Sequence, residues 1–423
     1  MPSLKSVLLN SLKSFLLPLC LSAVSGVFAA LLTTMFFESL DFVTSVRQSE
    51  PYLVLLLPLT GFYLAWVFEK VFHKRTLESS LVFEEIHNPR VTLPPTMVLM
   101  TFFGTTLSHL VGASVGREGA LLQMNAALTD QWNHFFTFTP KQRKKILMAA
   151  LSGGFSAITG APIAGALFGM EVVDTGRMQW QSILDCFVSA YVAWGTLEYF
   201  EAGHRLFAVV DVPELSLSLI AAVVAAGILC GFLARVFIWM THFVERQLQK
   251  WVKNSLYRPT LGGLILAIFF LVEGSRNFEG LGLATLRTAF VLPSSGLYFP
   301  LTKLVATAWS IGSGFKGGEY VPLVLIGTTA AGALGSLVGM QSLLSAIGYT
   351  ACFAGAANVP IAGALLALET FGPYVGIYAF LACLVSYHYS GQHGIYKSQK
   401  ISKGKSAIVH KVRGLFGPLL SRL

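Results

Sequence analysis

The residue best placed to do chemistry is a glutamate in a glycine-rich break between long apolar stretches. Glu118 lies at the centre of residues 115–122, with Gly112, Gly116 and Gly119 around it. An ionisable side chain at membrane depth is costly and by default marks the path of an ion or a proton. A broken helix is tolerated there where it lines a cavity, and its first N–H groups bind anions. An ionised Glu118 would compete with such an anion and a protonated one would move aside, which couples anion passage to a proton.

The chain also contains an internal repeat. Residues 151–171 match residues 349–369 at a constant offset, and they share a phenylalanine, the sequence Pro-Ile-Ala-Gly-Ala-Leu and a closing glutamate. Two membrane halves with interrupted helices are typical of secondary transporters and related channels, whose substrate site lies between the repeats. We interpret the closing glutamates, Glu171 and Glu369, as structural groups that cap or pair near an interface.

The repeat predicts a partner for Glu118 in the second half, and residues 312–323 provide it. They place Glu319 in a second glycine-rich break ahead of an apolar run. Ordinary ion pairs are the structural alternative, because Arg117 stands next to Glu118 and Lys316 stands three residues before Glu319. Both interpretations stay open at this point.

The elements that carry these residues have the composition of a membrane protein. Of 423 residues, 54% are hydrophobic and only 12% are charged, against roughly 25% charged in soluble domains. Several apolar stretches exceed the roughly 20 residues that a spanning helix needs. The stretches without Asp, Glu, Lys or Arg are 14–37, 51–68, 91–116, 146–170 and 320–368. Further apolar segments lie near 182–200, 215–234, 259–272, 288–302 and 370–389. We therefore expect an all-α bundle of about ten or more helices, some too short to cross alone.

Charge and cysteine usage exclude other classes of protein. The net charge of +9 fits the positive-inside bias of membrane proteins, and no soluble domain supports nucleic-acid binding. The cysteines are scattered in apolar segments without paired spacing, so we expect no disulfide framework, metal site or cofactor. Lys5 and Lys13 precede the first apolar run, which places the N-terminus in the cytoplasm, and the run lacks a clear cleavage site.

Four segments resemble the CLC family of voltage-gated chloride channels and anion/proton antiporters. Gly-Arg-Glu-Gly at 116–119 resembles the family's gating motif. Gly-Glu-Tyr-Val-Pro at 318–322 stands where chloride-selective members carry Gly-x-Phe-x-Pro, and is similar to the Gly-Gly-Glu-Val-Thr-Pro pattern of the fluoride/proton antiporter branch. Segments 84–89 and 390–396 also look like that branch.

The resemblance implies roles for individual residues. Glu118 would be the gate that alternately occupies the anion site and carries the proton, and Glu319 a second carboxylate near the centre. Tyr396 would donate its hydroxyl to the anion. Backbone N–H groups would complete the cradle around Gly116, Arg117, Gly119 and Ala120 in the first half and around Tyr320, Val321 and the residues up to Leu323 in the second.

Two differences from the family's sequence pattern bear on which halide is the substrate. The family's first anion loop is not intact, and Ser79 and Ser80 stand roughly in its place. These hydroxyls are either anion donors, which favours chloride, or a helix cap, which we favour on the residues alone. Val321 replaces the threonine of the fluoride branch, whereas Glu319 favours fluoride.

We therefore predict CLC-type halide transport, with fluoride export coupled to proton import ahead of a chloride channel or chloride/proton antiporter. An intramembrane enzyme is the remote alternative, because no catalytic constellation accompanies Ser114 or His109. The expected architecture has two inverted halves, 1–210 and 211–396, whose broken half-helices meet at the membrane midplane, and a basic cytoplasmic tail, 397–423. The expected setting is a multi-pass homodimer in the bilayer of the cell inner membrane, with halide and proton as partners.

Overall fold

The computed structural model of the protein describes residues 4–71, 80–200, 212–290, 296–401 and 405. Helices form almost all of the regular structure in this part of the chain, and two short strands form the rest. The all-α, multi-span expectation is confirmed. Ser79 lies outside the described residues, as do most residues of the basic tail.

The described residues form sixteen α-helices, of which eight precede residue 201. Their bounds are α1 Leu4–Ser49, α2 Leu57–Trp66, α3 Ser80–His87, α4 Thr96–Leu110, α5 Glu118–Thr129, α6 Pro140–Thr159, α7 Pro162–Glu171 and α8 Ile183–Tyr199. Short 3-10 turns (Pro51–Leu56, Asp130–His134 and Trp180–Ser182) and a π-turn (Val67–Val71) adjoin them.

Eight more α-helices follow residue 211. Their bounds are α9 Leu217–Trp251, α10 Arg258–Glu273, α11 Leu283–Thr288, α12 Tyr298–Ser313, α13 Tyr320–Val338, α14 Gln341–Ala357, α15 Pro360–Phe371 and α16 Pro373–Tyr389. Two 3-10 turns, Ser255–Tyr257 and Arg276–Phe278, lie among them. Strand β1, Asp174–Thr175, pairs in parallel with β2, Lys400–Ile401.

The helix limits differ from the limits of the uncharged stretches. The apolar stretch 14–37 belongs to a helix that continues past Glu38 and Asp41 to Ser49. The stretch 320–368 holds all of α13 and α14 and most of α15, and among its described residues the segment near 288–302 holds the end of α11 at Thr288 and the start of α12 at Tyr298. Charged residues do not end a helix, because its backbone hydrogen bonds continue regardless of the side chains. Five helical segments of the described chain are long and apolar enough to cross a bilayer: Phe15–Ser49, Pro51–Lys70, Leu217–Trp251, Ser255–Glu273 and Tyr320–Val338.

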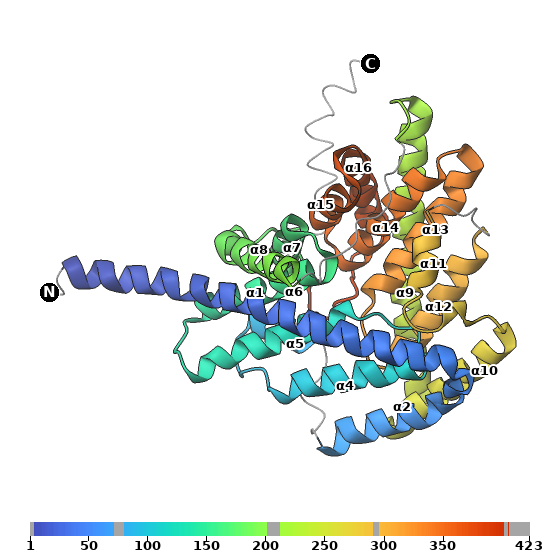
Figure 1. The fold of residues 1–423 in the computed structure, drawn as a ribbon, viewed down its shortest axis with the longest axis horizontal. Helices are drawn as coiled ribbons and strands as arrows, with labels where there is room; N and C mark the ends of the chain where they lie inside the picture. The colour runs from blue at the N-terminus through green and yellow to red at the C-terminus, as the bar shows by residue number, and fades with distance from the viewer. Residues whose placement is uncertain (1–3, 72–79, 201–211, 291–295, 402–404, 406–423) are drawn as a thin grey trace.

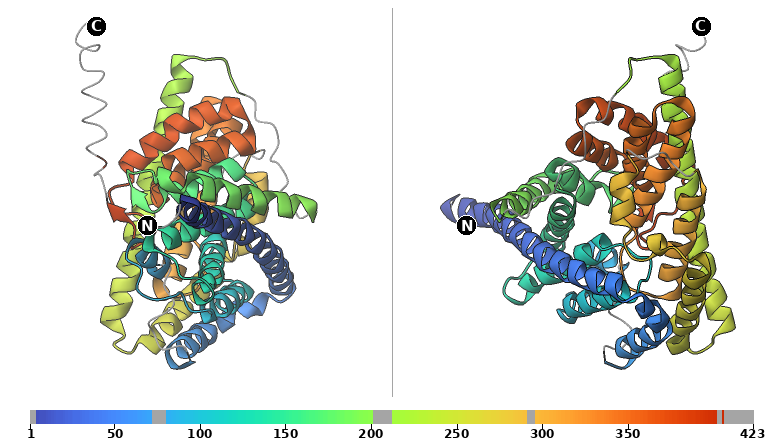
Figure 2. Two further views of the ribbon diagram at one scale, coloured as in Figure 1. Left: turned by 90° about the vertical axis from the view of Figure 1, so that its left-hand side faces the viewer. Right: turned by 45° about the vertical axis from the view of Figure 1, so that its right-hand side comes forward.

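The tertiary contacts repeat from one half to the other. The long helix α1 packs against α6 and α8, and the long helix α9 packs against α14 and α16. These two long helices run along different sides of the bundle (Figures 1 and 2). Matching helices also meet directly, since α7 contacts α15 and α2 contacts α10. The sequence repeat is therefore present in the packing.

Glu171 and Glu369 tie the matching helices α7 and α15 together. Each carboxylate lies in the last turn of its own helix and accepts two backbone N–H bonds from the first turn of the other helix. The donors are Ile361 and Ala362 for Glu171, at 3.1 and 2.8 Å, and Ile163 and Ala164 for Glu369, at 2.9 and 2.7 Å. The first N–H groups of a helix have no partner within it, and the helix dipole favours a negative charge there. The interpretation of both glutamates as caps is confirmed.

We predict that Glu369→Ala lowers the free energy of unfolding by about 2 kcal/mol, because two amides lose their acceptor. The measurement is the thermal unfolding of the purified protein in detergent. Glu198→Ala, on the exposed side of α8, is the control and should change stability by less than about 0.5 kcal/mol. Equal unfolding temperatures for the two variants would contradict the capping role.

Candidate functional site

The two glycine-rich breaks pair with each other at the centre of the molecule. Gly116 donates its N–H to the carbonyl of Gly318 at 2.6 Å, and Gly318 donates to the carbonyl of Gly116 at 2.8 Å. The two residues form an isolated antiparallel bridge. The structure thus brings the two segments together, as their repeat relationship led us to expect. The N–H of Gly116 is used in this pairing. Its predicted place in the anion cradle stays a prediction.

Only glycine fits this contact between the halves. A Cβ atom on Gly318 would stand 2.5 Å from the nitrogen of Gly119, and one on Gly116 would stand 2.8 Å from the carbonyl oxygen of Gly318. Real Cβ atoms do not approach other atoms so closely. The glycines therefore allow two helix starts, those of α5 and α13, to lie side by side.

Glu118 is the first residue of α5. Its side chain is 2% exposed. One carboxylate oxygen, Oε2, accepts the N–H of Arg117 at 3.0 Å and the N–H of Val321, in the first turn of α13, at 3.4 Å. Glu118 therefore occupies the start of the partner helix, where an anion is stabilised by unpaired N–H groups. The amides of Gly119 and Ala120, in the first turn of α5, lie beside it.

Arg117 forms the predicted alternative contact with Glu118. The distance from Nε of Arg117 to Oε1 of Glu118 is 3.6 Å, and the arginine side chain is 13% exposed. The guanidinium also lies 3.3 Å from the ring centroid of Phe37. Cation–π contact and an ion pair both hold the arginine in place. Glu118 is thus held by one loose ion pair and two amides.

Glu319 has a different environment from Glu118. It is the N-cap residue of α13, and it lies on the wall of a cavity of about 330 Å³. A Cβ atom on Gly119 would stand 3.6 Å from Oε2 of Glu319, so this carboxylate lies beside the first turn of α5, next to Glu118. The ammonium of Lys316 lies over the ring of Phe68, 4.5 Å from the centroid. The structure thus places Glu319 beside both Glu118 and a cavity.

Tyr396 lies near the cavity that Glu319 borders. Its side chain is 8% exposed, and its chain neighbours Ile395 and Lys397 line that cavity. A second cavity, of about 510 Å³, has Tyr396, Arg235, Arg246, His393 and Lys397 among its lining residues. Lys397 lines both cavities. This arrangement places the tyrosine on a basic cavity and near the cavity that Glu319 borders.

The sequence-based prediction missed an aromatic cluster beside the glutamates. Tyr320 stands edge-on to Phe353 and Phe155, with ring centroids 4.6 and 5.6 Å away. Phe155 stacks on Phe168 at 4.1 Å, and Phe168 lies 6.5 Å from Tyr396. Phe155 and Phe353 are the phenylalanines that match within the repeat. This matching was the one sequence signal that pointed to the cluster.

The remaining predicted residues lie as follows. Ser80 is the first residue of α3 and lies on the wall of the 330 Å³ cavity, a position that suits both a cap and an anion donor. The hydroxyl of Ser114 hydrogen-bonds with that of Thr307 at 2.8 Å. The Nε2 atom of His109 lies 3.4 Å from the carbonyl oxygen of Gly116. In these contacts Ser114 and His109 support the loop that leads to Glu118.

The fold and the site define an integral membrane protein in which two related helix starts meet at buried carboxylates. The family described as voltage gated chloride channel matches residues 60–391. The chain belongs to this family, the CLC family.

The relatives of the chain include both chloride and fluoride proteins. A protein named chloride/fluoride channel protein from Pseudomonas syringae pv. tomato is 38% identical over 92% of this chain and 87% of its own length. The crystal structure of a CLC-type fluoride/proton antiporter superposes with a TM-score of 0.85 at 27% identity, covering 91% of this chain and 98% of that one. A slow cyanobacterial Cl-/H+ antiporter has the same fold, with a TM-score of 0.75 at 18% identity, over 93% of this chain and 97% of that one.

We predict that Gly318→Ala abolishes measurable ion transport, because the added methyl group would force the starts of α5 and α13 apart. The measurement is ion efflux from liposomes that contain the purified variant. Gly195→Ala, in α8 where a Cβ atom meets nothing within 4 Å, is the control and should keep normal flux. Normal flux through Gly318→Ala would show that the close contact is not needed.

Proposed function

We propose that the protein exports fluoride in exchange for protons. The observation that carries this proposal is the pairing of two helix starts that carry Glu118 and Glu319, with the buried Tyr396 nearby. The chloride/fluoride channel relative and the fluoride/proton antiporter structure support it. Both relatives align with nearly the whole chain.

Glu118 acts as the gate in this proposal. Its carboxylate accepts one amide at the start of α13, that of Val321, which an anion would otherwise take. When Glu118 is ionised, it and a fluoride ion repel each other, so only one of them occupies the helix start. When Glu118 is protonated, its charge is gone and the fluoride ion replaces it. Each exchange of places therefore moves a proton with the gate.

Glu319 and Tyr396 make the proposed site suitable for fluoride. Fluoride is the halide that accepts the strongest hydrogen bonds, so a protonated carboxyl group and a phenol are favourable donors to it. Glu319 borders the 330 Å³ cavity. It is thus placed to exchange a proton with water as well as to meet the anion.

The proposed orientation of the protein in the membrane follows from the position of its basic residues. Lys397 and Lys400 follow the last long helix, and an excess of basic residues marks the cytoplasmic side. We place the two cavities lined by Lys397, the N-terminus and the tail 397–423 on that side, in the cell inner membrane. Halves 1–210 and 211–396 would then be inverted repeats. Family membership supports a homodimer with one pore per subunit.

A chloride channel or chloride/proton antiporter is the second candidate. The observation that favours it is Ser80, a hydroxyl residue on the wall of the cavity that Glu319 borders. Val321 also lacks the hydroxyl that the fluoride branch carries near this place. Measurement of fluoride flux and chloride flux through the same protein distinguishes the two candidate functions.

We predict that liposomes loaded with fluoride and containing the wild-type protein release fluoride and take up protons. Glu118→Gln should lower coupled proton movement by about 10²-fold or more, the range for loss of a positioned proton-transferring group. A fluoride electrode and a pH electrode record both ions. Absence of fluoride and chloride flux in the wild type would refute halide transport. Unchanged coupled proton flux in Glu118→Gln would refute the gate.

We also predict that Glu319→Ala abolishes fluoride transport, because the anion loses a carboxyl partner beside the gate. Fluoride efflux is measured as before, with chloride-loaded liposomes run in parallel. Glu245→Ala is the control, because Glu245 lines the same cavity and pairs with Lys397 at 2.9 Å without being at a helix start. A Glu319→Ala protein that exports fluoride normally would leave Glu319 with a structural role.

A further inference from the structure

A short helix, α3, borders the proposed anion site from one side. Its first residue, Ser80, lies on the wall of the cavity that Glu319 borders. The ring of Phe83 lies 4.9 Å from the ring of Tyr396, centroid to centroid. The helix has only eight residues, of which Val82, Phe83 and Ile86 carry its buried apolar surface. So small an apolar face gives α3 few packing contacts to fix its position.

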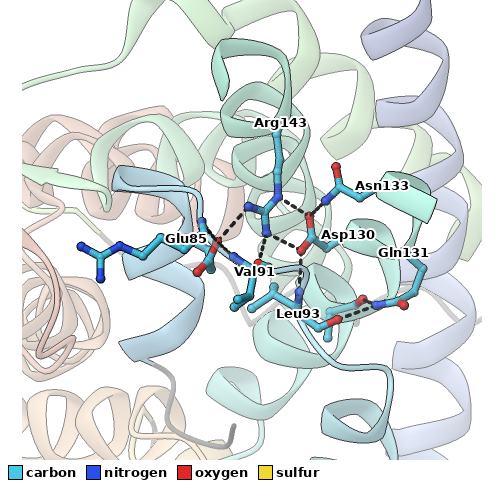
Figure 3. A network of polar contacts seen from close by, with 9 residues as sticks. Glu85, Val91, Leu93, Asp130, Gln131, Asn133 and Arg143 are labelled. Carbon is cyan, nitrogen blue, oxygen red and sulfur yellow. Dashed lines mark hydrogen bonds and ion pairs between the residues drawn. The ribbon is translucent and has the colours of Figure 1, made fainter. Parts of the chain in front are cut away.

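A buried arginine holds the end of α3 to the rest of the first half (Figure 3). Arg143, in the first turn of α6, donates to Glu85 at 2.8 Å and to both oxygens of Asp130 at 2.8 and 2.6 Å. It also donates to the carbonyl of Val91 at 2.7 Å. All three charged residues are buried. A planar guanidinium that makes bidentate contacts fixes the relative orientation of its partners.

The two carboxylates also hold the segment that follows α3. Glu85 accepts the backbone N–H groups of Arg90 and Val91, at 2.8 and 3.2 Å. Asp130 accepts the N–H of Leu93 at 2.7 Å. Figure 3 shows the arginine between these two carboxylates, with the connecting segment against it. The network therefore joins α3, the segment that leads to α4, the end of α5 and the start of α6.

Two further contacts attach α3 to segments beyond this network. Glu84 accepts a hydrogen bond from the hydroxyl of Ser398, two residues after Tyr396, at 2.9 Å. The Nε2 atom of His87 lies 3.1 Å from the carbonyl oxygen of Val173. The backbone beside Tyr396 is held separately, since Ile395 donates to the carbonyl of Ala356 at 2.9 Å. The orientation of the Tyr396 ring then depends on what packs against it, and both Phe83 and Phe168 are aromatic neighbours of this ring.

We propose that Arg143 is a positioning residue for the anion site, which acts through Glu85 and Phe83 on the ring of Tyr396. Arg143 does not touch the anion. It holds α3 at the distance at which Phe83 contacts Tyr396, so that the hydroxyl points to the place where the anion binds. The role of Tyr396 as an anion donor in this inference rests on the proposed function. The effect of Arg143 on the position of the Tyr396 ring does not depend on it.

The first test observes the ring without transport. The protein is labelled with 3-fluorotyrosine, and the ¹⁹F signal of Tyr396 is assigned by its loss in Tyr396→Phe. Glu85→Gln, which keeps the size of the side chain and leaves Arg143 paired with Asp130, should shift or broaden this signal. Glu279→Gln is the matched control, because Glu279 pairs with another buried arginine, Arg47, at 3.5 Å, and it should leave the signal in place. An unchanged Tyr396 signal in Glu85→Gln would overturn the positioning role.

The second test measures function with a double-mutant cycle. Glu85→Gln should raise the half-saturating fluoride concentration for efflux by about fivefold, within the range of couplings between contacting residues. The same substitution should have no further effect in Tyr396→Phe, whereas Glu279→Gln should have the same effect in both backgrounds. Equal effects of Glu85→Gln in both backgrounds would show a merely structural role. Ser398→Ala, which leaves the buried ion pairs intact, should shift fluoride dependence in the same direction if Glu85→Gln does not fold.

The two tests separate failure of the inference from failure of the proposed function. A wild-type protein that moves no fluoride would refute the proposed function, and the ¹⁹F signal would still decide whether Arg143 controls the Tyr396 ring. Fluoride transport with an unchanged ¹⁹F signal and equal effects in both backgrounds would keep the proposed function and refute the inference.

Discussion

The structure depends on how the exposed N–H groups at helix starts are satisfied away from water. A helix leaves its first N–H groups without partners, and in a low-dielectric interior these groups stabilise a negative charge. This chain brings its own carboxylates to such positions. Glu369 caps α7, Glu171 caps α15 and Glu118 reaches α13. Three helix starts thus receive a carboxylate from the same polypeptide.

The hydrogen-bond distances of these carboxylates differ. The difference separates the two structural carboxylates from the one that has the proposed role in transport. Glu171 and Glu369 each accept two amides of another helix at 2.7 to 3.1 Å. Glu118 accepts only one such amide, at 3.4 Å, together with that of the preceding residue and a 3.6 Å ion pair. The first two carboxylates are firmly bound caps that hold the halves together. Glu118 is the weakly held one, which suits a group that exchanges places with an anion.

The rest of the site is arranged around the contact between these two helix starts. Glycines let the starts of α5 and α13 approach until a single methyl group would collide. Glu319 faces a cavity while Glu118 is enclosed, so the two carboxylates differ in access to water. Tyr396 packs against its aromatic neighbours Phe83 and Phe168. Arg143 is distant in sequence from all of these, yet its contacts define where α3 and Phe83 stand.

The sequence by itself determined the class of protein, the repeat and the central carboxylates. Apolar length and low charge are local properties, so they predicted an all-α membrane protein, and matching glycines and glutamates identified Glu118 and Glu319. Only the tertiary structure decided where α1 ends, that Gly116 donates its N–H to Gly318, that Phe83 packs against Tyr396, and that Arg143 binds Glu85 on the same helix as Phe83. These features arise from contacts between residues far apart in the chain, which leave no spacing pattern to detect. The structure also showed which carboxylates are tightly capped, because hydrogen-bond distances depend on how the helices pack.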